Sequence, residues 1–206
     1  MKTDSSAAVP YGGETMSRRI LCFGDSNTWG FDPRDQIENR YPPEERWPDL
    51  LAQATGWSVI NLGLNGRTVP YRKNEILSAL AQIRGRLPLD CLILMLGSND
   101  ALSMDFPSAD GVARRMDAFL RALRQDFPAL PVLLLSPPQV EIPLAHVQEL
   151  FWELIPEYRA LAAKHGARFA AAPEWRLPLA YDGVHLSAAA QRIFAEKLRE
   201  CLRELP

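Results

Sequence analysis

Short apolar runs alternate along the chain with longer stretches in which apolar residues recur at helical spacing. Strands that alternate with helices in this way are typical of a parallel sheet covered by helices on both faces. We therefore predict an α/β protein with a three-layer α/β/α architecture and a flavodoxin-like five-stranded parallel sheet in the order 2-1-3-4-5. The predicted strands are Arg19–Phe23, Ser58–Leu62, Cys91–Leu96, Val132–Ser136 and Ala167–Ala171.

The amphipathic stretches between these strands carry start and stop signals of helices. Pro48 lies early enough to occupy a first turn, and Gly56 is a typical stop. Ser108 and Ser187 are side chains that cap helix N-termini well. The predicted helices run from about Pro48 to Gly56, over Asn74–Arg84, from Ser108 to before Pro128, over Leu150–Lys164 with Pro156 as an interior weakness, and from Ser187 through Leu202.

One domain is expected, because the chain shows no internal repeat, no low-complexity segment and no second hydrophobic core. We place it over residues 17–206 and interpret residues 1–16 as a polar N-terminal tail. This tail has one lysine and no apolar run of the kind found in signal peptides. The longest apolar run is far shorter than the roughly 20 residues that span a bilayer. The sequence thus predicts a cytoplasmic protein without a membrane partner.

The charge balance indicates the kind of partner, and the cysteine positions indicate the redox state of the thiols. Lys and Arg number 23 and Asp and Glu 25, which gives a formal net charge of -2, and no run of five like charges occurs. This balance does not favour a nucleic-acid surface, so a small molecule is the expected partner. The three cysteines cannot all pair, and Cys22 and Cys91 fall in apolar runs. Reduced thiols in the core are therefore expected.

Small polar clusters follow the first three predicted strands. They are GDSNTWG at 24–30, NGRT at 65–68 and GSND at 97–100, and a fourth cluster, DGVH at 182–185, precedes the last helix. Ligands of open parallel sheets bind at the carboxyl ends of the strands. We therefore expect these clusters to meet at one edge of the sheet.

In this order, the four clusters resemble the four diagnostic blocks of the SGNH hydrolases, also called the GDSL family. The resemblance extends from Arg19 to His185, which is nearly the whole chain. The stretches RILCFGDSNTWG, LPLDCLILMLGSND and VLLLSPP are most similar to the arylesterase and acyltransferase branch of this family. Asn27 departs from that branch, which has an apolar residue at this position, and Gly66 departs where the branch also accepts alanine.

The resemblance implies a role for each motif residue. Ser26 is implied as the nucleophile, with Asp182 and His185 completing a catalytic triad. Gly66 and Asn99 are implied to form an oxyanion hole, with the backbone N–H of Ser26 as a third donor. Family chemistry requires no cofactor, and the carboxylates near these motifs match no known spacing of metal ligands, so we expect neither cofactor nor metal.

The chemistry of these residue types agrees with those roles. A serine hydroxyl is a weak nucleophile unless a neighbouring base takes its proton, and imidazole can act as that base near neutral pH. The chain has three histidines. His165 is accounted for at a helix end and His146 has no carboxylate motif nearby, which leaves His185. Asp182, three residues earlier, can orient its ring and stabilise the imidazolium.

The oxyanion of a tetrahedral intermediate needs hydrogen-bond donors. The side-chain amide of Asn99 supplies N–H groups that an aspartate lacks, and Gly66 lets the backbone approach closely without a Cβ. Trp29 and Phe31, beside the nucleophile, are weaker candidates for the substrate pocket. There is no G-x-S-x-G motif, so the usual α/β-hydrolase arrangement is not expected.

Structural interpretations of the same residues remain open. Ser26 and Asn99 are also helix-capping residue types, while Asn65–Gly66 and Asp182–Gly183 are good turn dipeptides. A non-catalytic flavodoxin-like protein that binds a phosphate or nucleotide at the strand ends is the alternative from another class. A receiver-type signalling domain fits less well, because Gly-Ser-Asn ends the third strand where a phosphoacceptor aspartate would stand.

The preferred hypothesis is a serine esterase that acts on small aryl or alkyl esters with short acyl groups, because the loops between the motifs give no sign of a large lipid-binding lid. The branch that the chain resembles also adds acyltransferase and perhydrolase activity as hypotheses. Acetylated carbohydrate, phospholipid, lysophospholipid or thioester substrates are the alternatives. The expected partner is a small-molecule ester, and the sequence leaves a homo-oligomer open.

Overall fold

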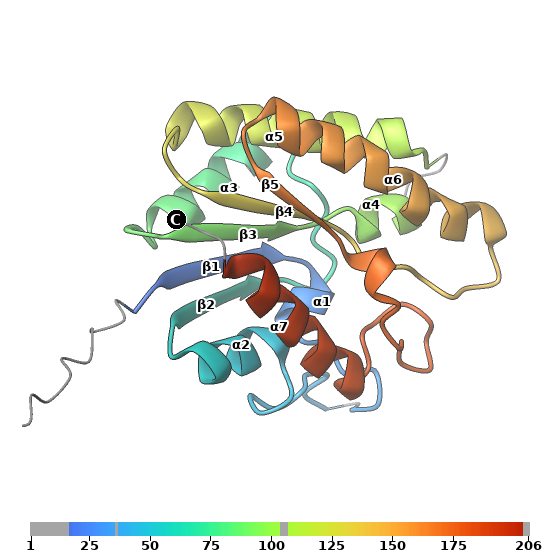
Figure 1. The fold of residues 1–206 in the computed structure, drawn as a ribbon. Coiled ribbons are helices and arrows are strands. Elements are labelled where there is room, and N and C mark those ends of the chain that lie inside the picture. The colour runs from blue at the N-terminus through green and yellow to red at the C-terminus, as the bar shows by residue number, and fades with distance from the viewer. Residues whose placement is uncertain (1–16, 36, 104–106, 204–206) are drawn as a thin grey trace, which may run out of the picture.

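The computed structural model describes residues 17–35, 37–103 and 107–203 of the chain. Its core is a sheet of five parallel strands in the order β2-β1-β3-β4-β5 (Figure 1). The predicted fold class and strand order are confirmed, and each strand end lies within one residue of its predicted position. The predicted tail at 1–16 lies outside the described residues. The strands are β1 (Arg19–Gly24), β2 (Ser58–Gly63), β3 (Cys91–Met95), β4 (Val132–Ser136) and β5 (Arg168–Ala171).

Helices cover both faces of the sheet, which gives the three layers (Figure 1). One face carries α3 (Lys73–Arg84), α5 (Ala109–Asp126) and α6 (Ala145–Lys164), and the other carries α2 (Trp47–Thr55) and α7 (Ala188–Leu202). Alternate strand residues enter the two cores. In β1, Leu21 and Phe23 pack toward the first set of helices, while Ile20 and Cys22 pack toward the second.

Three short elements follow strands directly, and the first two carry polar motifs to one edge of the sheet. They are α1 (Ser26–Trp29) after β1, α4 (Ser98–Ser103) after β3 and the 3-10 helix η1 (Ala172–Trp175) after β5. Because the strands are parallel, their carboxyl ends lie together. The motif containing Ser26 and the motif containing Asn99 therefore become neighbours.

The predicted capping signals are present. Ser108 Oγ accepts a hydrogen bond from the backbone N–H of Gly111, Ser187 Oγ accepts one from Ala190, and Gly56 ends α2 with a left-handed φ of 70°. These contacts satisfy backbone N–H groups at helix N-termini and carbonyl groups at helix C-termini, which have no partner within the helix.

The prediction for α6 was wrong at its start. The helix begins at Ala145 instead of Leu150 and continues through Pro156. No side chain caps its first turn, so the sequence lacks a start signal there. Buried Val147, one turn before Leu150, extends the apolar stripe and explains the earlier start.

The three cysteines are free thiols, as predicted. Cys22 and Cys91 are buried and Cys201 is half-buried. Burial raises the pKa of the Cys91 thiol to about 12, so this thiol stays protonated at neutral pH.

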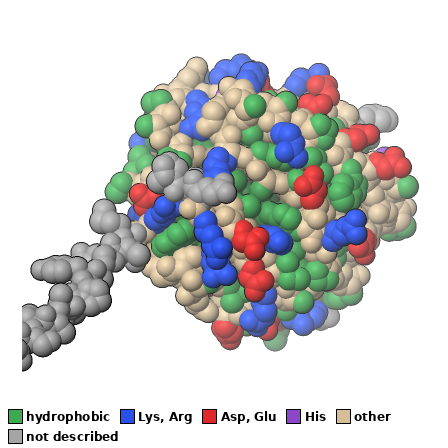
Figure 2. Space-filling model, viewed as in Figure 1, with side chains coloured by type: hydrophobic (Ala, Val, Ile, Leu, Met, Phe, Trp, Pro, Cys, Tyr) green, Lys and Arg blue, Asp and Glu red, His purple; other side chains and the backbone are tan. Residues whose placement is uncertain are grey.

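On the face in Figure 2, basic and acidic side chains are interspersed. None of the helices within the described residues is long and apolar enough to cross a membrane.

Candidate active site

Three predicted site residues meet at the carboxyl edge of the sheet. Ser26 is the first residue of α1, and Asp182 and His185 lie in the loop before α7. His185 Nε2 lies 3.0 Å from Ser26 Oγ, although the two residues are 159 positions apart in the sequence. His185 Nδ1 lies 2.6 Å from Asp182 Oδ2. The structure thus aligns a hydroxyl, an imidazole and a carboxylate in one chain of hydrogen bonds.

Asp182 also shapes the loop that carries His185. Its Oδ1 accepts hydrogen bonds from the backbone N–H groups of Val184 and His185, both at 3.0 Å. Burial alone would raise the pKa of the Asp182 carboxyl, but the hydrogen bonds from the His185 ring and from the two backbone groups outweigh burial and lower this pKa. The carboxylate is therefore charged at neutral pH and holds the imidazole in one orientation.

Gly183 permits the turn between these two residues. Its φ is +67°, and a Cβ at this position would lie 2.0 Å from the carbonyl oxygen of Glu141. The Glu141 N–H in turn donates to the Gly183 carbonyl at 2.7 Å. The loop is thus fixed against the segment that follows β4.

Asn27 joins the serine helix to the histidine loop. Its Oδ1 accepts a hydrogen bond from the backbone N–H of Leu186 at 2.9 Å, and its carbonyl oxygen accepts one from Trp47 Nε1 at 2.9 Å. Asn27 is 3% exposed, so these bonds are shielded from water. Sequence reasoning gave Asn27 no part in the site. The signal was its polar side chain where the similar branch has an apolar one.

The predicted oxyanion residues lie on adjoining elements. Asn99, in α4, donates a side-chain hydrogen bond from Nδ2 to the carbonyl oxygen of Arg67 at 3.0 Å. Gly66 directly precedes Arg67 and has a φ of +71°. Apart from Gly66 and its two chain neighbours, no described residue has an atom within 4 Å of the position that a Cβ of Gly66 would take, so its left-handed backbone is what favours glycine there.

Asp100 binds the loop after β2 at a second position. This buried carboxylate accepts hydrogen bonds from the backbone N–H of Val69 and from Arg115 Nη1, both at 2.8 Å. The loop after β2 is therefore tied to α4 at Arg67 and at Val69. Such ties restrict the motion of Gly66 and Asn99 relative to each other.

The two aromatic residues predicted to line the substrate pocket lie beside the triad. The centroid of the Phe31 ring is 4.3 Å from that of His185, and the Trp29 ring is 6.5 Å from Phe31. The Arg40 guanidinium lies 4.7 Å above the Trp29 ring. Phe31 thus covers one face of the imidazole, and its role in binding a substrate stays a prediction.

The other two histidines lie away from Ser26. The His165 ring, at the end of α6, contacts Asp117 of α5 at 2.6 Å, and His146 is exposed on α6. Within residues 17–35, 37–103 and 107–203, no group of three or more His, Cys, Asp or Glu side chains is arranged to hold a metal ion.

Asp25 is a buried carboxyl next to Ser26, and sequence reasoning did not assign it to the site. It is 0% exposed, and its Oδ1 accepts the backbone N–H of Asn27 at 2.9 Å, which caps α1. Oδ2 has no hydrogen-bond partner among the described residues. Burial raises the pKa of Asp25 from 3.8 to about 6. At neutral pH the Asp25 carboxyl is therefore mostly ionised, and burial of this charge lowers the stability of the folded protein.

This pKa predicts a pH-dependent effect of Asp25→Asn on stability. Because the folded carboxyl holds its proton more tightly than the unfolded one, ionisation reduces wild-type stability as the pH rises from about 4 to about 7. Relative to wild type, Asp25→Asn should gain about 2 kcal/mol in the free energy of unfolding over this interval. Urea denaturation of both proteins at the two pH values measures the gain. An equal difference at both values would contradict it.

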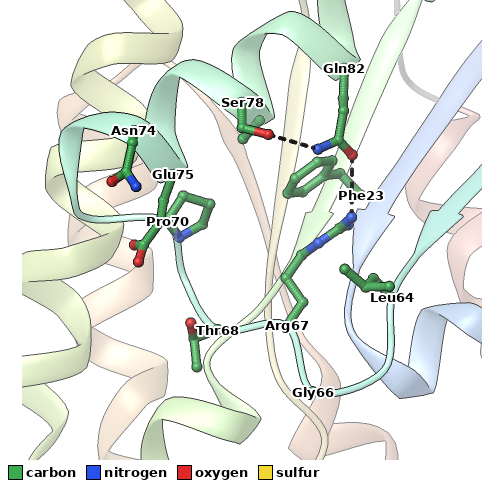
Figure 3. Close-up of a pocket in the computed structure, with 11 residues that line it drawn as sticks. Phe23, Leu64, Gly66, Arg67, Thr68, Pro70, Asn74, Glu75, Ser78 and Gln82 are labelled. Atoms are coloured by element: carbon green, nitrogen blue, oxygen red, sulfur yellow. Dashed lines mark hydrogen bonds between the residues drawn. The ribbon is translucent and has the colours of Figure 1, made fainter.

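A cavity of about 390 Å³ adjoins the Gly66 loop on the side of α3 (Figure 3). Phe23 and Arg67 contribute to its lining, together with side chains along α3 from Asn74 to Gln82. The lining includes Gly66 but none of Ser26, Asp182 and His185. The cavity is therefore separate from the triad, although the two share the loop.

The α/β/α fold and the chain of hydrogen bonds between Ser26, His185 and Asp182 are typical of a serine hydrolase. The model of the GDSL-like lipase/acylhydrolase family matches residues 22–193. The chain belongs to this family, and it is an enzyme with the esterase or acylhydrolase function of the family. A search of curated proteins gave no match.

Solved structures agree with this assignment. The chain is similar to Est24, a carbohydrate acetylesterase from Sinorhizobium meliloti, with a TM-score of 0.80, 28% identity and coverage of 92% of this chain and 100% of that chain. It is similar to the aryl esterase of M. smegmatis, with a TM-score of 0.79, 28% identity and the same coverage. A lipolytic G-D-S-L protein from Veillonella parvula DSM 2008, 20% identical over 91% of this chain and 99% of that chain, shares the fold, with a TM-score of 0.72.

Proposed function

We propose that this enzyme hydrolyses small carboxylic esters through an acyl-enzyme on Ser26, with His185 as base and Asp182 as its orienting acid. The observation that carries the proposal is the chain of hydrogen bonds from Ser26 Oγ to His185 Nε2 at 3.0 Å and from His185 Nδ1 to Asp182 at 2.6 Å. These distances are within the reach that proton transfer requires.

In the proposed mechanism, Ser26 Oγ attacks the ester carbonyl carbon while His185 Nε2 accepts its proton. The tetrahedral intermediate collapses, the bond to the alcohol oxygen breaks, and His185 donates the proton to the departing alcohol. Water then attacks the acyl-enzyme with His185 again as base, which releases the carboxylic acid and restores the Ser26 hydroxyl. Asp182 stabilises the imidazolium at each step.

The oxyanion would be held by the backbone N–H groups of Ser26 and Gly66 and by the side-chain amide of Asn99. An amide has two N–H donors. In Asn99, Nδ2 already donates to the Arg67 carbonyl, which orients the amide and leaves one N–H for the substrate. This arrangement supports the assignment because donors stabilise a transition state only when they are positioned in advance.

Asn99→Ala should therefore reduce kcat for p-nitrophenyl acetate by about 100- to 1,000-fold while the protein stays folded. Exposed Asn74, in the first turn of α3, provides the matched control, and Asn74→Ala should retain wild-type kcat. Initial rates with both variants, together with thermal unfolding curves, test the role. A folded Asn99→Ala enzyme with full kcat would remove Asn99 from the oxyanion hole.

Short acyl groups are the proposed substrates, and two observations support this class. The loops that carry the motifs are short, and solved structures with 28% identity include an aryl esterase and a carbohydrate acetylesterase. Rates with p-nitrophenyl esters from acetate to long-chain acids test it, with the highest kcat/KM expected for the shortest. A steep rise toward long chains would contradict the proposal.

Acetylated carbohydrate is the second candidate substrate, because Est24 is a carbohydrate acetylesterase. Release of acetate from a peracetylated sugar, compared with turnover of p-nitrophenyl acetate, separates the two.

Acyl transfer or perhydrolysis would follow from the same acyl-enzyme if an alcohol or a peroxide outcompeted water. Both would appear as a new ester or peracid when that acceptor is added to the assay.

A further inference from the structure

Arg67 is a half-buried arginine in the loop between β2 and α3 whose side chain turns inward. Figure 3 shows it extending from the loop across Phe23 toward Gln82 of α3. Its guanidinium carbon lies 4.0 Å from the centroid of the Phe23 ring, and Nη2 donates to Gln82 Oε1 at 3.4 Å. The buried Asp25 carboxylate also attracts this guanidinium electrostatically. The side chain is therefore held inside the protein by carbonyl, amide and aromatic contacts and by a buried carboxylate.

The guanidinium joins the ends of two strands that lead into the site. Arg67 Nη1 donates to the carbonyl oxygen of Gly24 at 3.0 Å and also to that of Leu62. Gly24 is the last residue of β1, two positions before Ser26, and Leu62 lies near the end of β2. One side chain thus fixes the loop after β2 against the end of the strand that leads to Ser26.

The backbone of Arg67 completes the connection. Its carbonyl oxygen accepts the Asn99 side-chain amide at 3.0 Å, and its N–H donates to the Leu64 carbonyl at 3.1 Å. Gly66 lies within the turn that the bond between Leu64 and Arg67 closes. Arg67 is therefore anchored by its side chain and, through its main chain, touches one proposed oxyanion donor and directly follows the other.

The chemistry of arginine suits this position. A planar guanidinium presents several N–H donors in a fixed geometry, whereas a lysine ammonium is a compact charge on a flexible stem. Burial lowers the pKa of Arg67 to about 10, which still leaves it charged at neutral pH. A half-buried cation costs desolvation energy, which the hydrogen bonds to carbonyl oxygens and the attraction of the Asp25 carboxylate offset.

From these contacts we propose that Arg67 is a positioning residue for ester hydrolysis: it holds Gly66 and Asn99 where they meet the oxyanion. The proposal rests on the proposed function and adds a residue to it. Arg67 itself touches no reacting atom. Its removal should displace the donors, and displacements of about 1 Å in an active site cost about 100-fold in rate.

The test compares Arg67→Lys and Arg67→Met with Arg72→Lys, a matched control on the same loop whose side chain is 67% exposed. With p-nitrophenyl acetate, both Arg67 variants should lose about 10- to 100-fold in kcat, with KM within about threefold of wild type. Arg72→Lys should match wild type. A split between kcat and KM identifies a role in the transition state, which a purely structural residue would not show.

A second measurement tests whether Arg67 acts through Asn99. The loss caused by Arg67→Lys should be smaller in an Asn99→Ala background than in wild type, because residues that act together are not additive. An equal loss in both backgrounds, an unchanged kcat in Arg67→Lys, or loss of the cooperative unfolding transition in both Arg67 variants would overturn the proposal. Failure of the proposed function is distinct, because wild type would then not turn over the ester at all.

Discussion

Ser26→Ala is expected to lower kcat for p-nitrophenyl acetate by about a millionfold, which is the loss seen when the nucleophile of a serine hydrolase is removed. Without Oγ the acyl-enzyme cannot form, and the remaining oxyanion donors can only assist a direct attack by water. The substitution removes one oxygen from a residue that is 8% exposed, so the fold should remain intact. Progress curves over hours, at high enzyme concentration, measure the residual rate.

Ser78→Ala is the control for this measurement, because Ser78 is an exposed serine on α3 that lines the cavity beside the loop. It should retain the wild-type rate. Substantial turnover by folded Ser26→Ala would show that the reaction does not pass through Ser26. The aligned Ser26, His185 and Asp182 side chains would then have to serve a reaction in which water attacks the ester directly.

His185→Gln is the second large effect, and its loss of kcat should also approach about a millionfold. Glutamine is close in size and can keep a polar contact to Asp182, but it cannot accept a proton from Ser26 Oγ near neutral pH. Because the base and the nucleophile act as a unit, combining this change with Ser26→Ala should cost little more than either alone. Initial rates of the two single variants and of the double variant measure this non-additivity.

The other histidines provide the controls for this prediction. His146→Gln, on the exposed surface of α6, should leave kcat unchanged. His165→Gln removes the 2.6 Å contact with Asp117 and should lower stability more than activity. A rate for His185→Gln within about tenfold of wild type would exclude His185 as the general base, since removing the base of a serine triad costs about a millionfold.

Strand positions followed closely from the sequence because each strand is a short apolar run between polar segments. Runs such as Cys91–Leu96 are buried on both faces, which leaves a continuous hydrophobic signal. Their parallel arrangement then placed the motif residues at one edge. Helix α6 shows the limit of this approach, because Leu144 offers no capping side chain and the first turn carries few apolar residues.

The residues that support the site were harder to predict than the residues that form it. The side chains of Asn27 and Arg67 bind backbone groups. Every residue has such backbone groups, so the sequence does not indicate which residue is the partner. Asp25 caps α1, a common position for aspartate, and only the folded chain shows that its side chain is fully buried. Local patterns identify chemistry, whereas contacts across the sheet edge require the folded chain.

The measurement that tests the central claim most directly is the reaction of the wild-type protein with a fluorophosphonate, followed by intact mass and peptide mapping. Phosphonylation requires a serine activated by a base, so it reports on the triad without knowledge of the substrate. We expect one adduct per chain, located on Ser26, with none in Ser26→Ala and a much slower reaction in His185→Gln. A folded wild type that gains no adduct, or gains it at another residue, would contradict the account.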